Sequence, residues 1–270
     1  AFYEEREIIF IFNMLALEYL GLTSAKLLLY GEETVDNDIL GMFLEGLEKL
    51  KENTPVQYIL GYSEFLEYKI NVGPGVLIPR PETEELCKII IDEHAGAGQN
   101  LRILDIGTGS ACIPVALYNG LQGIEITAID NSMEALKYAG INLKNNRAEA
   151  EIKKLDFLDD NSWKALGKFD VIVSNPPYVT MDDTDLMRNN VLEHEPHPAL
   201  FADKANALLF YEKINDFAKD HLNAGGTLYL EINEKFGSNL LAMFKGHDYS
   251  RLELKKDLNG RDRFLIAGKH

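Results

Sequence analysis

Cysteine is nearly absent from the sequence, which holds two, Cys87 and Cys112, among its 270 residues and no Cys-x-x-Cys pair. This usage excludes a disulfide scaffold, gives no support for a structural zinc site and is typical of a reducing cytosol. Long apolar runs are also missing, because the longest, Ile8–Phe12, is far short of the roughly 20 residues that cross a bilayer. No basic segment followed by an apolar one opens the sequence. We therefore expect a cytoplasmic protein without membrane contact, in which both cysteines are small buried residues.

Basic residues are scarce relative to acidic ones. Lys and Arg number 27 against 43 for Asp and Glu, which gives a formal net charge of −16. A protein that grips a nucleic-acid backbone usually needs a basic face that releases counterions. The balance therefore favours a protein or small-molecule partner, and we expect no direct contact with nucleic acid. The hydrophobic share of 46% and the charged share of 26% are those of an ordinary globular protein and exclude wholesale disorder.

The N-terminal region, residues 1–53, has the periodicity of helices. Two sets of apolar residues recur at helical spacing: Ile8, Phe12, Leu15 and Tyr19, then Ile39, Phe43, Leu47 and Leu50. Thr23-Ser24 and Asp36–Asp38 are suitable N-caps between the helices. None of these residues is typical of a catalytic site. We predict a small helical bundle that packs on, or recognises, something else.

The next region, residues 54–81, is predicted to be a linker. Proline and glycine punctuate short β-like runs there, of which Tyr68–Val72 alternates weakly and Val76–Ile78 is apolar. We expect these two runs to form a β-hairpin between the helical region and the remainder of the chain.

Strands and helices alternate through the third region, residues 82–270. The expected strands are Leu101–Asp105, Ile124–Asp130, Glu151–Leu155, Phe169–Ser174, Thr227–Ile232, Leu252–Lys256 and Phe264–Ala267. The expected helices are Glu82–Glu93, Ala111–Asn119, Ser132–Asn145, Lys204–His221 and Glu234–Phe244. This alternation predicts an α/β fold with a doubly wound, seven-stranded, mostly parallel sheet. The last two strands, separated by Asn259-Gly260, are expected to form an antiparallel hairpin that ends the sheet.

A glycine-rich turn follows the first strand of the predicted sheet. The segment Asp105–Ser110 reads Asp-Ile-Gly-Thr-Gly-Ser and leads into a helix, whose N-terminal amides can face a ligand. A dinucleotide fingerprint would place a third glycine where Cys112 stands, which weakens an NAD interpretation. Asp130 ends the second strand, where an acid can accept hydrogen bonds from both hydroxyls of a ribose. The alternative is a tight turn with a capping aspartate.

The fourth strand runs into Asn175-Pro176-Pro177-Tyr178. Each proline fixes its own φ and restricts the residue before it, so this segment is rigid. The Asn175 side-chain oxygen and the Pro176 carbonyl then form a pre-set pair of acceptors, which suits the two hydrogens of a planar amino group. Tyr178 can lie against the flat face of the same group. The alternative interpretation is a turn that merely ends the strand.

These motifs together resemble class I S-adenosylmethionine-dependent methyltransferases, which have a Rossmann-like fold, and in particular those that methylate a planar nitrogen. Pro55–Gly61 and Val76–Glu84 are similar to the signature of the HemK/PrmC family. The resemblance continues at Glu195-Pro196, Ala199-Leu200, Lys256–Leu258 and Gly260–Arg263, and covers nearly the whole chain, the N-terminal helices only in general character. That family transfers a methyl group from S-adenosylmethionine to the side-chain amide nitrogen, N5, of the glutamine in the Gly-Gly-Gln motif of peptide-chain release factors.

The resemblance also implies roles for individual residues. It assigns Gly107, Thr108, Gly109, Ser110 and Ala111 to the methionine side of S-adenosylmethionine, Asp130 to the ribose, Asp156 and Phe157 to the adenine, and Asn175, Pro176, Pro177 and Tyr178 to the glutamine amide. Asn175 is also expected to contact the cofactor, and Asn175, Pro176 and Tyr178 are the expected catalytic residues. The family commonly has glycine where Ala111 stands, a departure that tightens the pocket. The resemblance implies a methyltransferase domain over residues 82–270 and substrate recognition by residues 1–53. The roles of Arg80 and Glu82, substrate contact or structural ion pair, stay open.

Other functions stay open at this point. Asn-Pro-Pro-Tyr also occurs in adenine-N6 methyltransferases that act on nucleic acid, and a related enzyme could methylate a glutamine of a ribosomal protein. A third alternative is a cofactor-binding protein without catalysis. Glu193–His197 has the residue types of a metal site, but Pro196 and Pro198 prevent the helical spacing that would bring ligands together. We therefore expect no metal, and a monomer whose substrate is a release factor.

Overall fold

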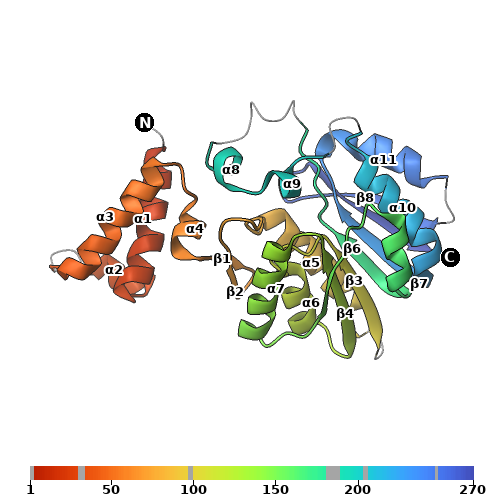
Figure 1. The fold of residues 1–270 in the computed structure, drawn as a ribbon, viewed down its shortest axis with the longest axis horizontal. Helices are drawn as coiled ribbons and strands as arrows, with labels where there is room; N and C mark the ends of the chain where they lie inside the picture. Colours follow the sequence, from red (N-terminus) through yellow and green to blue (C-terminus); the bar gives the residue numbers. More distant parts are fainter. Residues whose placement is uncertain (1–2, 30–33, 97–99, 181–188, 203–205, 247–248) are drawn as a thin grey trace.

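The computed structural model describes residues 3–29, 34–96, 100–180, 189–202, 206–246 and 249–270 (Figure 1). Its N-terminal helices stand to one side of the sheet, at the left of Figure 1. They are α1 (Glu5–Leu20), α2 (Ser24–Leu29), α3 (Asn37–Lys51) and the short α4 (Val56–Leu60). Asp36 caps α3, as expected, by accepting a hydrogen bond from the Asp38 amide. Ile11, Leu15, Leu50 and Val56 form the small buried core of this region.

The buried face of α1 is turned relative to the one expected from the sequence. Leu15 is buried as expected, but Ile8 and Phe12 are 52% and 53% exposed, while Ile11 is buried. Phe12 instead stacks on the Phe43 ring at a centroid distance of 5.8 Å. A region of a few short helices cannot enclose every apolar side chain of α1, so some of the apolar residues at helical spacing face solvent.

The linker contains the expected hairpin, but with different strands. β1 (Tyr62–Phe65) pairs antiparallel with β2 (Tyr68–Asn71). The expected strand at Val76–Ile78 is wrong. This run is buried at its two ends but lies between the turn at Gly75, whose φ is +94°, and Pro79, which has no amide to donate to a sheet. The Tyr58 hydroxyl donates to the Val76 carbonyl at 2.6 Å and so connects α4 to this loop.

The third region forms the predicted seven-stranded sheet. In spatial order its strands are β5 (Glu151–Lys154), β4 (Ile124–Asp130), β3 (Leu101–Ile106), β6 (Phe169–Ser174), β7 (Leu222–Glu231), β9 (Asp262–Lys269) and β8 (Tyr249–Lys256). The pairs among β3, β4, β5, β6 and β7 are parallel. β9 is antiparallel to both β7 and β8, so the expected C-terminal hairpin is confirmed.

Helices cover both faces of this sheet, as a doubly wound fold requires. One buried cluster joins the sheet to α5 (Pro81–His94), α6 (Cys112–Gly120), α7 (Met133–Asn145) and the hairpin. A second cluster on the other face joins it to α10 (Leu209–His221) and α11 (Gly237–Phe244). The shorter helices are η1 (Asp160–Ala165), α8 (Asn189–His194), α9 (His197–Leu200) and η3 (Glu234–Phe236). Within the described ranges, no helix combines the length and apolar character needed to cross a membrane.

The order of the strands reverses at β3, whose neighbours are β4 on one side and β6 on the other. In open parallel sheets, ligands bind in the crevice that such a reversal creates at the carboxyl ends of the strands. The glycine turn, Asp130 and Asn175 follow or end these three strands. The fold therefore brings the predicted site residues to one edge of the sheet.

Candidate active site

A cavity of about 700 Å³ lies at this edge of the sheet. Nine of the residues predicted from the sequence line it: Gly107, Thr108, Gly109, Ser110, Asp130, Asp156, Phe157, Asn175 and Pro177. The other three, Ala111, Pro176 and Tyr178, lie outside its lining. The cavity thus combines both predicted ends of the site, the glycine turn and the segment after β6.

The glycine turn has the backbone conformation that its residues predict. Gly107 and Gly109 have φ values of +73° and +55°, in the left-handed region that favours glycine. The amides of Gly107 and Thr108 both donate to the Ile129 carbonyl at 2.9 Å, which holds the turn against β4. Ala111 also has a positive φ, +60°, and is fully buried. A left-handed alanine costs roughly 1–2 kcal/mol, which gives a physical reason for a glycine at this position in similar sequences.

Asp130 connects the end of β4 to the glycine turn. Its carboxylate accepts hydrogen bonds from the Gly109 amide at 2.9 Å and the Ser132 amide at 2.8 Å. Burial raises the pKa of Asp130, and these backbone amides oppose that shift. Asp130 therefore stabilises the turn after β4, as in the alternative interpretation, but it caps no helix, because Ser132 is the N-cap of α7. Asp130 also lines the cavity.

Asp105, which sequence reasoning treated only as the end of a strand, is buried with unsatisfied oxygens. Its side chain is 1% exposed, and neither carboxylate oxygen has a hydrogen-bond partner among the described residues. The same holds for the Thr108 hydroxyl. Burial raises the pKa of Asp105 to about 7, with the Thr108 hydroxyl opposing the shift. A buried acid without partners, next to a glycine turn, is suited to a cationic ligand group.

The opposite side of the cavity is aromatic. Phe157 is 4% exposed and packs against Trp163, Phe210 and Phe217. The Trp163 indole donates to the Phe157 carbonyl at 2.9 Å, so the tryptophan supports the cavity wall from behind. Asp156 accepts a hydrogen bond from the Leu158 amide at 3.0 Å and stabilises the turn that carries Phe157.

Asn175, directly after β6, has a fixed side chain. Its Nδ2 donates to the Thr83 hydroxyl at 3.0 Å, which leaves the side-chain oxygen available on the cavity side. The Tyr178 hydroxyl donates instead to Glu231 at 2.9 Å, away from the predicted stacking position. Thr83 and Glu231 were missed as site residues. Thr83 belongs to the signature stretch, and an acid that ends the apolar strand β7 was the available signal for Glu231.

Arg80, whose role the sequence left open, forms an ion pair. Its guanidinium lies 2.7 Å from a carboxylate oxygen of Glu195, which is 1% exposed at the side chain and also accepts from the Ile78 amide. The pair joins the signature loop to the segment between α8 and α9. The negative charge of Glu82 disfavours the ionised form of Glu231 and favours the charged form of Arg263, so it raises the pKa of both groups.

The remaining members of the Glu193–His197 segment have separate partners. Glu193 accepts from Asn53, His194 contacts the Glu52 carbonyl at 2.8 Å, and His197 contacts the Leu192 carbonyl. Two of these contacts reach the end of the N-terminal region.

Asn142 of α7 is a further residue that the sequence did not single out. It is fully buried, accepts from the Asn71 amide at 2.6 Å, and donates to the carbonyls of Asn71 and Ser110 at 2.9 Å. One side chain thus connects the linker hairpin to the glycine turn. An asparagine within an otherwise ordinary amphipathic helix gave no signal for this role.

Two family models match parts of the chain: the Methyltransferase small domain at residues 86–197 and the PrmC N-terminal domain at residues 10–61. Two solved structures share the fold. A T. thermophilus 16S rRNA N2 G1207 methyltransferase, in complex with AdoMet and guanosine, has a TM-score of 0.54 and 18% identity, over 77% of this chain and 50% of that one. A methyltransferase from Pyrococcus furiosus has a TM-score of 0.52 and 21% identity, over 83% of this chain and 97% of that one.

Relatives with more similar sequences cover nearly the whole chain. The release factor glutamine methyltransferase of Flavobacterium psychrophilum is 38% identical over 97% of this chain and 92% of its own length. The protein of the same name from Lactococcus lactis is 41% identical over 86% of this chain and 84% of its own length. With this identity and coverage, added to a glycine turn and an Asn-Pro-Pro-Tyr segment on one cavity, the chain belongs to the release factor glutamine methyltransferase family.

Proposed function

We propose that this protein transfers a methyl group from S-adenosylmethionine to the side-chain amide nitrogen of the glutamine in the Gly-Gly-Gln motif of a peptide-chain release factor. The observation that carries the proposal is the position of Asn175 on the same cavity as the glycine turn and Asp130. The names of the family relatives support the substrate, and the net charge of −16 favours a protein over nucleic acid.

The residues of the cavity fit S-adenosylmethionine. Gly107 to Ser110 would hold its methionine part, Asp130 its ribose hydroxyls, and Asp156 with Phe157 its adenine. Ala111, also expected there, is buried outside the cavity lining and so does not tighten the pocket directly. Asp105 lies outside the cavity lining, but its buried, unsatisfied carboxylate adds negative charge beside the glycine turn. This charge supports the fit, because the methionine part carries an ammonium group that such an acid can neutralise. The raised pKa of Asp105 makes this neutralisation dependent on pH.

The reaction requires little beyond positioning. An amide nitrogen is a poor nucleophile, since its lone pair is delocalised into the carbonyl group. S-adenosylmethionine, when bound, supplies a methyl group on a sulfonium that is already electrophilic. Asn175, which lines the cavity, would accept one hydrogen of the substrate amide. The Pro176 carbonyl is the proposed acceptor of the other hydrogen, although Pro176 lies outside the cavity lining. The two bonds would orient the nitrogen, so that binding energy replaces an entropic barrier. The same hydrogen bonds oppose the delocalisation and favour a pyramidal nitrogen during attack.

No general base is assigned. An amide that has gained a methyl group on nitrogen is strongly acidic while it keeps both hydrogens, so it loses one of them to water. Tyr178 supports the segment that holds the substrate amide rather than taking this proton, because its hydroxyl donates to Glu231 and burial raises its pKa well above the usual value.

Each of the three regions would have a different role in this reaction. Residues 82–270 hold the cofactor and the reacting amide, and residues 54–81 connect them to residues 1–53, which would contact the release factor. The apolar side chains that the N-terminal helices expose, among them Ile9 at 53% and Phe10 at 61%, support this contact.

The test is methylation of a purified release factor with labelled S-adenosylmethionine, followed by mass-spectrometric mapping of the label. We expect one methyl group on the glutamine of the Gly-Gly-Gln motif and none on a factor with alanine at that position. Label at an adenine of nucleic acid, or at a ribosomal-protein glutamine in preference to the factor, would contradict the proposal.

A further inference from the structure

A chain of hydrogen bonds runs from the end of β7 to Asn175, behind the cavity. Glu231 is fully buried, and its two carboxylate oxygens have different donors. Oε2 accepts from the Thr83 hydroxyl at 2.7 Å, and Oε1 accepts from the Tyr178 hydroxyl at 2.9 Å. Thr83 Oγ1 in turn lies 3.0 Å from Nδ2 of Asn175. Residues from α5, β7 and the segment after β6 thus meet in one polar network.

With Glu231 ionised, the hydrogen bonds of this network run in one direction. An ionised carboxylate accepts hydrogen bonds and donates none, whereas a hydroxyl has a single proton to give. The Thr83 proton therefore goes to Glu231, and the Thr83 oxygen can only accept from Asn175. Since an asparagine amide has nearly the same shape in its two orientations, this acceptor decides which end faces the cavity. Nδ2 turns towards Thr83, and Oδ1 is left for the substrate.

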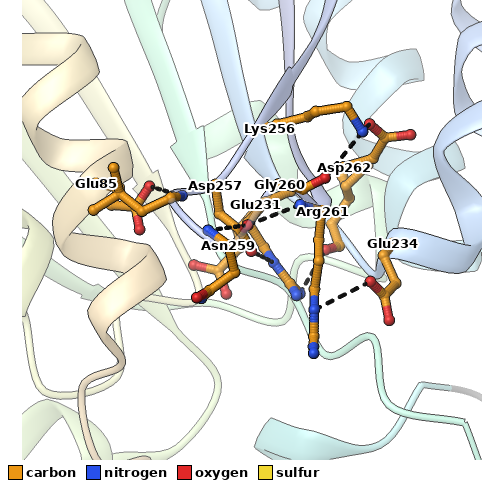
Figure 2. A network of polar contacts seen from close by, with 12 residues as sticks. Glu85, Glu231, Glu234, Lys256, Asp257, Asn259, Gly260, Arg261 and Asp262 are labelled. Atoms are coloured by element: carbon orange, nitrogen blue, oxygen red, sulfur yellow. Dashed lines mark hydrogen bonds and ion pairs between the residues drawn. The ribbon is translucent and has the colours of Figure 1, made fainter.

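A second group of residues supports the charge of Glu231. Burial raises the pKa of this carboxyl, while the bonds from Thr83 and Tyr178 and the charge of Arg263 lower it. Arg263 is itself held by the Ile232 carbonyl at 3.1 Å and by Asp257 at 3.3 Å. Figure 2 shows how Asp257 also organises the β8–β9 turn, where it accepts from the backbone amides of Asn259 and Arg261 at 2.9 Å. The C-terminal motif around Arg263 therefore contributes to the site indirectly.

We propose that Glu231 and Thr83 are positioning residues that set the orientation of the Asn175 amide, so that its oxygen and not its nitrogen meets the amino group of the substrate. This inference rests on the proposed function. It goes beyond that function because it assigns a role to Thr83, which lines the cavity beside Asn175, and to Glu231, which lies outside the cavity lining and touches neither cofactor nor substrate.

Two isosteric substitutions test the direction of the bonds. Thr83→Val keeps the shape but removes the acceptor for Nδ2, so the Asn175 amide loses its preferred orientation. Glu231→Gln replaces one acceptor by a donor. If that donor faces Thr83, the threonine oxygen accepts from it, and the threonine proton is then donated to Asn175. The Asn175 amide must rotate to accept this proton with Oδ1. Its Nδ2 would then face the amino group of the substrate, and two hydrogen-bond donors would meet. Thr83→Ser keeps the hydroxyl and is the conservative control.

The experiment is single-turnover methylation of a release factor at saturating S-adenosylmethionine, together with cofactor affinity and thermal unfolding for each variant. We expect Thr83→Val and Glu231→Gln to lower the rate about 10- to 100-fold, the scale of a misplaced hydrogen-bonding partner, with cofactor affinity unchanged. Thr83→Ser should retain the rate within about threefold, since its hydroxyl can make both bonds. Glu93→Gln is the matched control, because Glu93 of α5 also accepts from a tyrosine, Tyr229, but its other partner is Arg251 rather than Thr83. It should leave the rate unchanged.

A double-substitution cycle separates positioning from general loss of structure. In an Asn175→Ala background there is no amide to orient, so adding Thr83→Val should change the rate by less than about twofold. The same fold loss in both backgrounds would overturn the proposal, as would wild-type rates for Thr83→Val. If Glu231→Gln fails to fold, the Thr83 variants decide alone. A wild-type protein that leaves the release factor unmethylated would instead contradict the proposed function.

Discussion

The N-terminal helices and the methyltransferase domain bury their apolar residues to very different extents. In the methyltransferase domain, both faces of the sheet are covered by large buried clusters. In the N-terminal region, the buried core is limited to Ile11, Leu15, Leu50 and Val56. Leu28 and Leu29 of α2 are each 87% exposed. One region therefore completes its own core, and the other keeps apolar surface in contact with water.

The polar residues show the opposite distribution. The methyltransferase domain buries Asp105, Asn142, Glu195 and Glu231, each at 3% exposure or less. Burying such groups costs free energy unless they are paired. Asn142, Glu195 and Glu231 have partners that include Ser110, Arg80 and Thr83 of the cavity lining, whereas Asp105 has none among the described residues. Buried polar contacts are therefore concentrated at the cavity, and exposed apolar side chains are concentrated in the N-terminal region, where we propose that they bind the release factor. The following predictions test this division.

The largest effect is expected at Asn175. Asn175→Ala removes one of two acceptors for the substrate amide, and the loss should fall on the transition state, where alignment of the lone pair matters most. We expect a loss of about 10²–10³ in the single-turnover rate, as for other preorganised hydrogen-bonding partners. Cofactor affinity, measured by calorimetry, should be largely kept. Asn175→Asp is informative because it keeps an acceptor but adds charge near a sulfonium. Near-normal turnover by Asn175→Ala would reduce the Asn-Pro-Pro-Tyr segment to a strand-ending turn.

A smaller effect, on cofactor binding, is expected at Asp130. Asp130→Ala should leave the ribose hydroxyls without a charged acceptor and weaken binding by roughly 1.5–3 kcal/mol. Asp130→Asn can still accept from one backbone amide and should lose less. Calorimetry on folded variants measures both. Unchanged affinity in Asp130→Ala would restrict this residue to stabilising the turns at Gly109 and Ser132, and preference for NAD would overturn the cofactor assignment.

Asp105 should make cofactor binding depend on pH. Its pKa of about 7 in the free protein lies above the ordinary value of 3.8, so the folded state holds the proton between these two values. Ionisation therefore costs stability as the pH rises through this window. An ammonium ligand favours the ionised form, so affinity for S-adenosylmethionine should rise by up to about tenfold per pH unit from pH 5 to 7 and level off above. Asp105→Asn should remove this rise, and an identical profile in the variant would exclude Asp105 as its source.

The regular parts of the fold could be predicted because their signals are local. The strands β4 and β6 were expected with the bounds that the structure has, since apolar runs ending at Asp130 and Ser174 are followed by turn residues. Val76–Ile78 was wrongly assigned to a strand, because burial in a loop and burial in a strand give the same apolar pattern. The hairpin partner, Tyr62–Phe65, has no comparable apolar run.

The site could be predicted where residues act within one motif, and not where distant residues meet. The glycine turn and Asn175 were found because each is defined by its neighbours in sequence. Thr83 and Glu231 are 148 residues apart, and no local pattern shows that their side chains are in contact. The buried, unsatisfied state of Asp105 depends in the same way on packing that only the folded chain provides.

The smallest effect is expected at the exposed apolar residues of the N-terminal helices. Ile9→Ser on α1 removes apolar surface that we propose meets the release factor, and burial of such a half-exposed side chain contributes about 1 kcal/mol, or a factor of about five. We therefore expect a higher KM for an intact factor with kcat unchanged. The matched control is Ile141→Ser on α7, because Ile141 is 46% exposed, close to the 53% of Ile9, but belongs to the methyltransferase domain. A short peptide containing Gly-Gly-Gln should be methylated equally by both variants, since it reaches only the cavity.

Equal KM values of the Ile9→Ser variant and the unchanged protein for the intact factor would mean that Ile9 makes no contact with it. If deletion of the N-terminal helices from a folded protein also left the rate unchanged, their role would be structural, and the contrast between the two regions would concern stability rather than recognition.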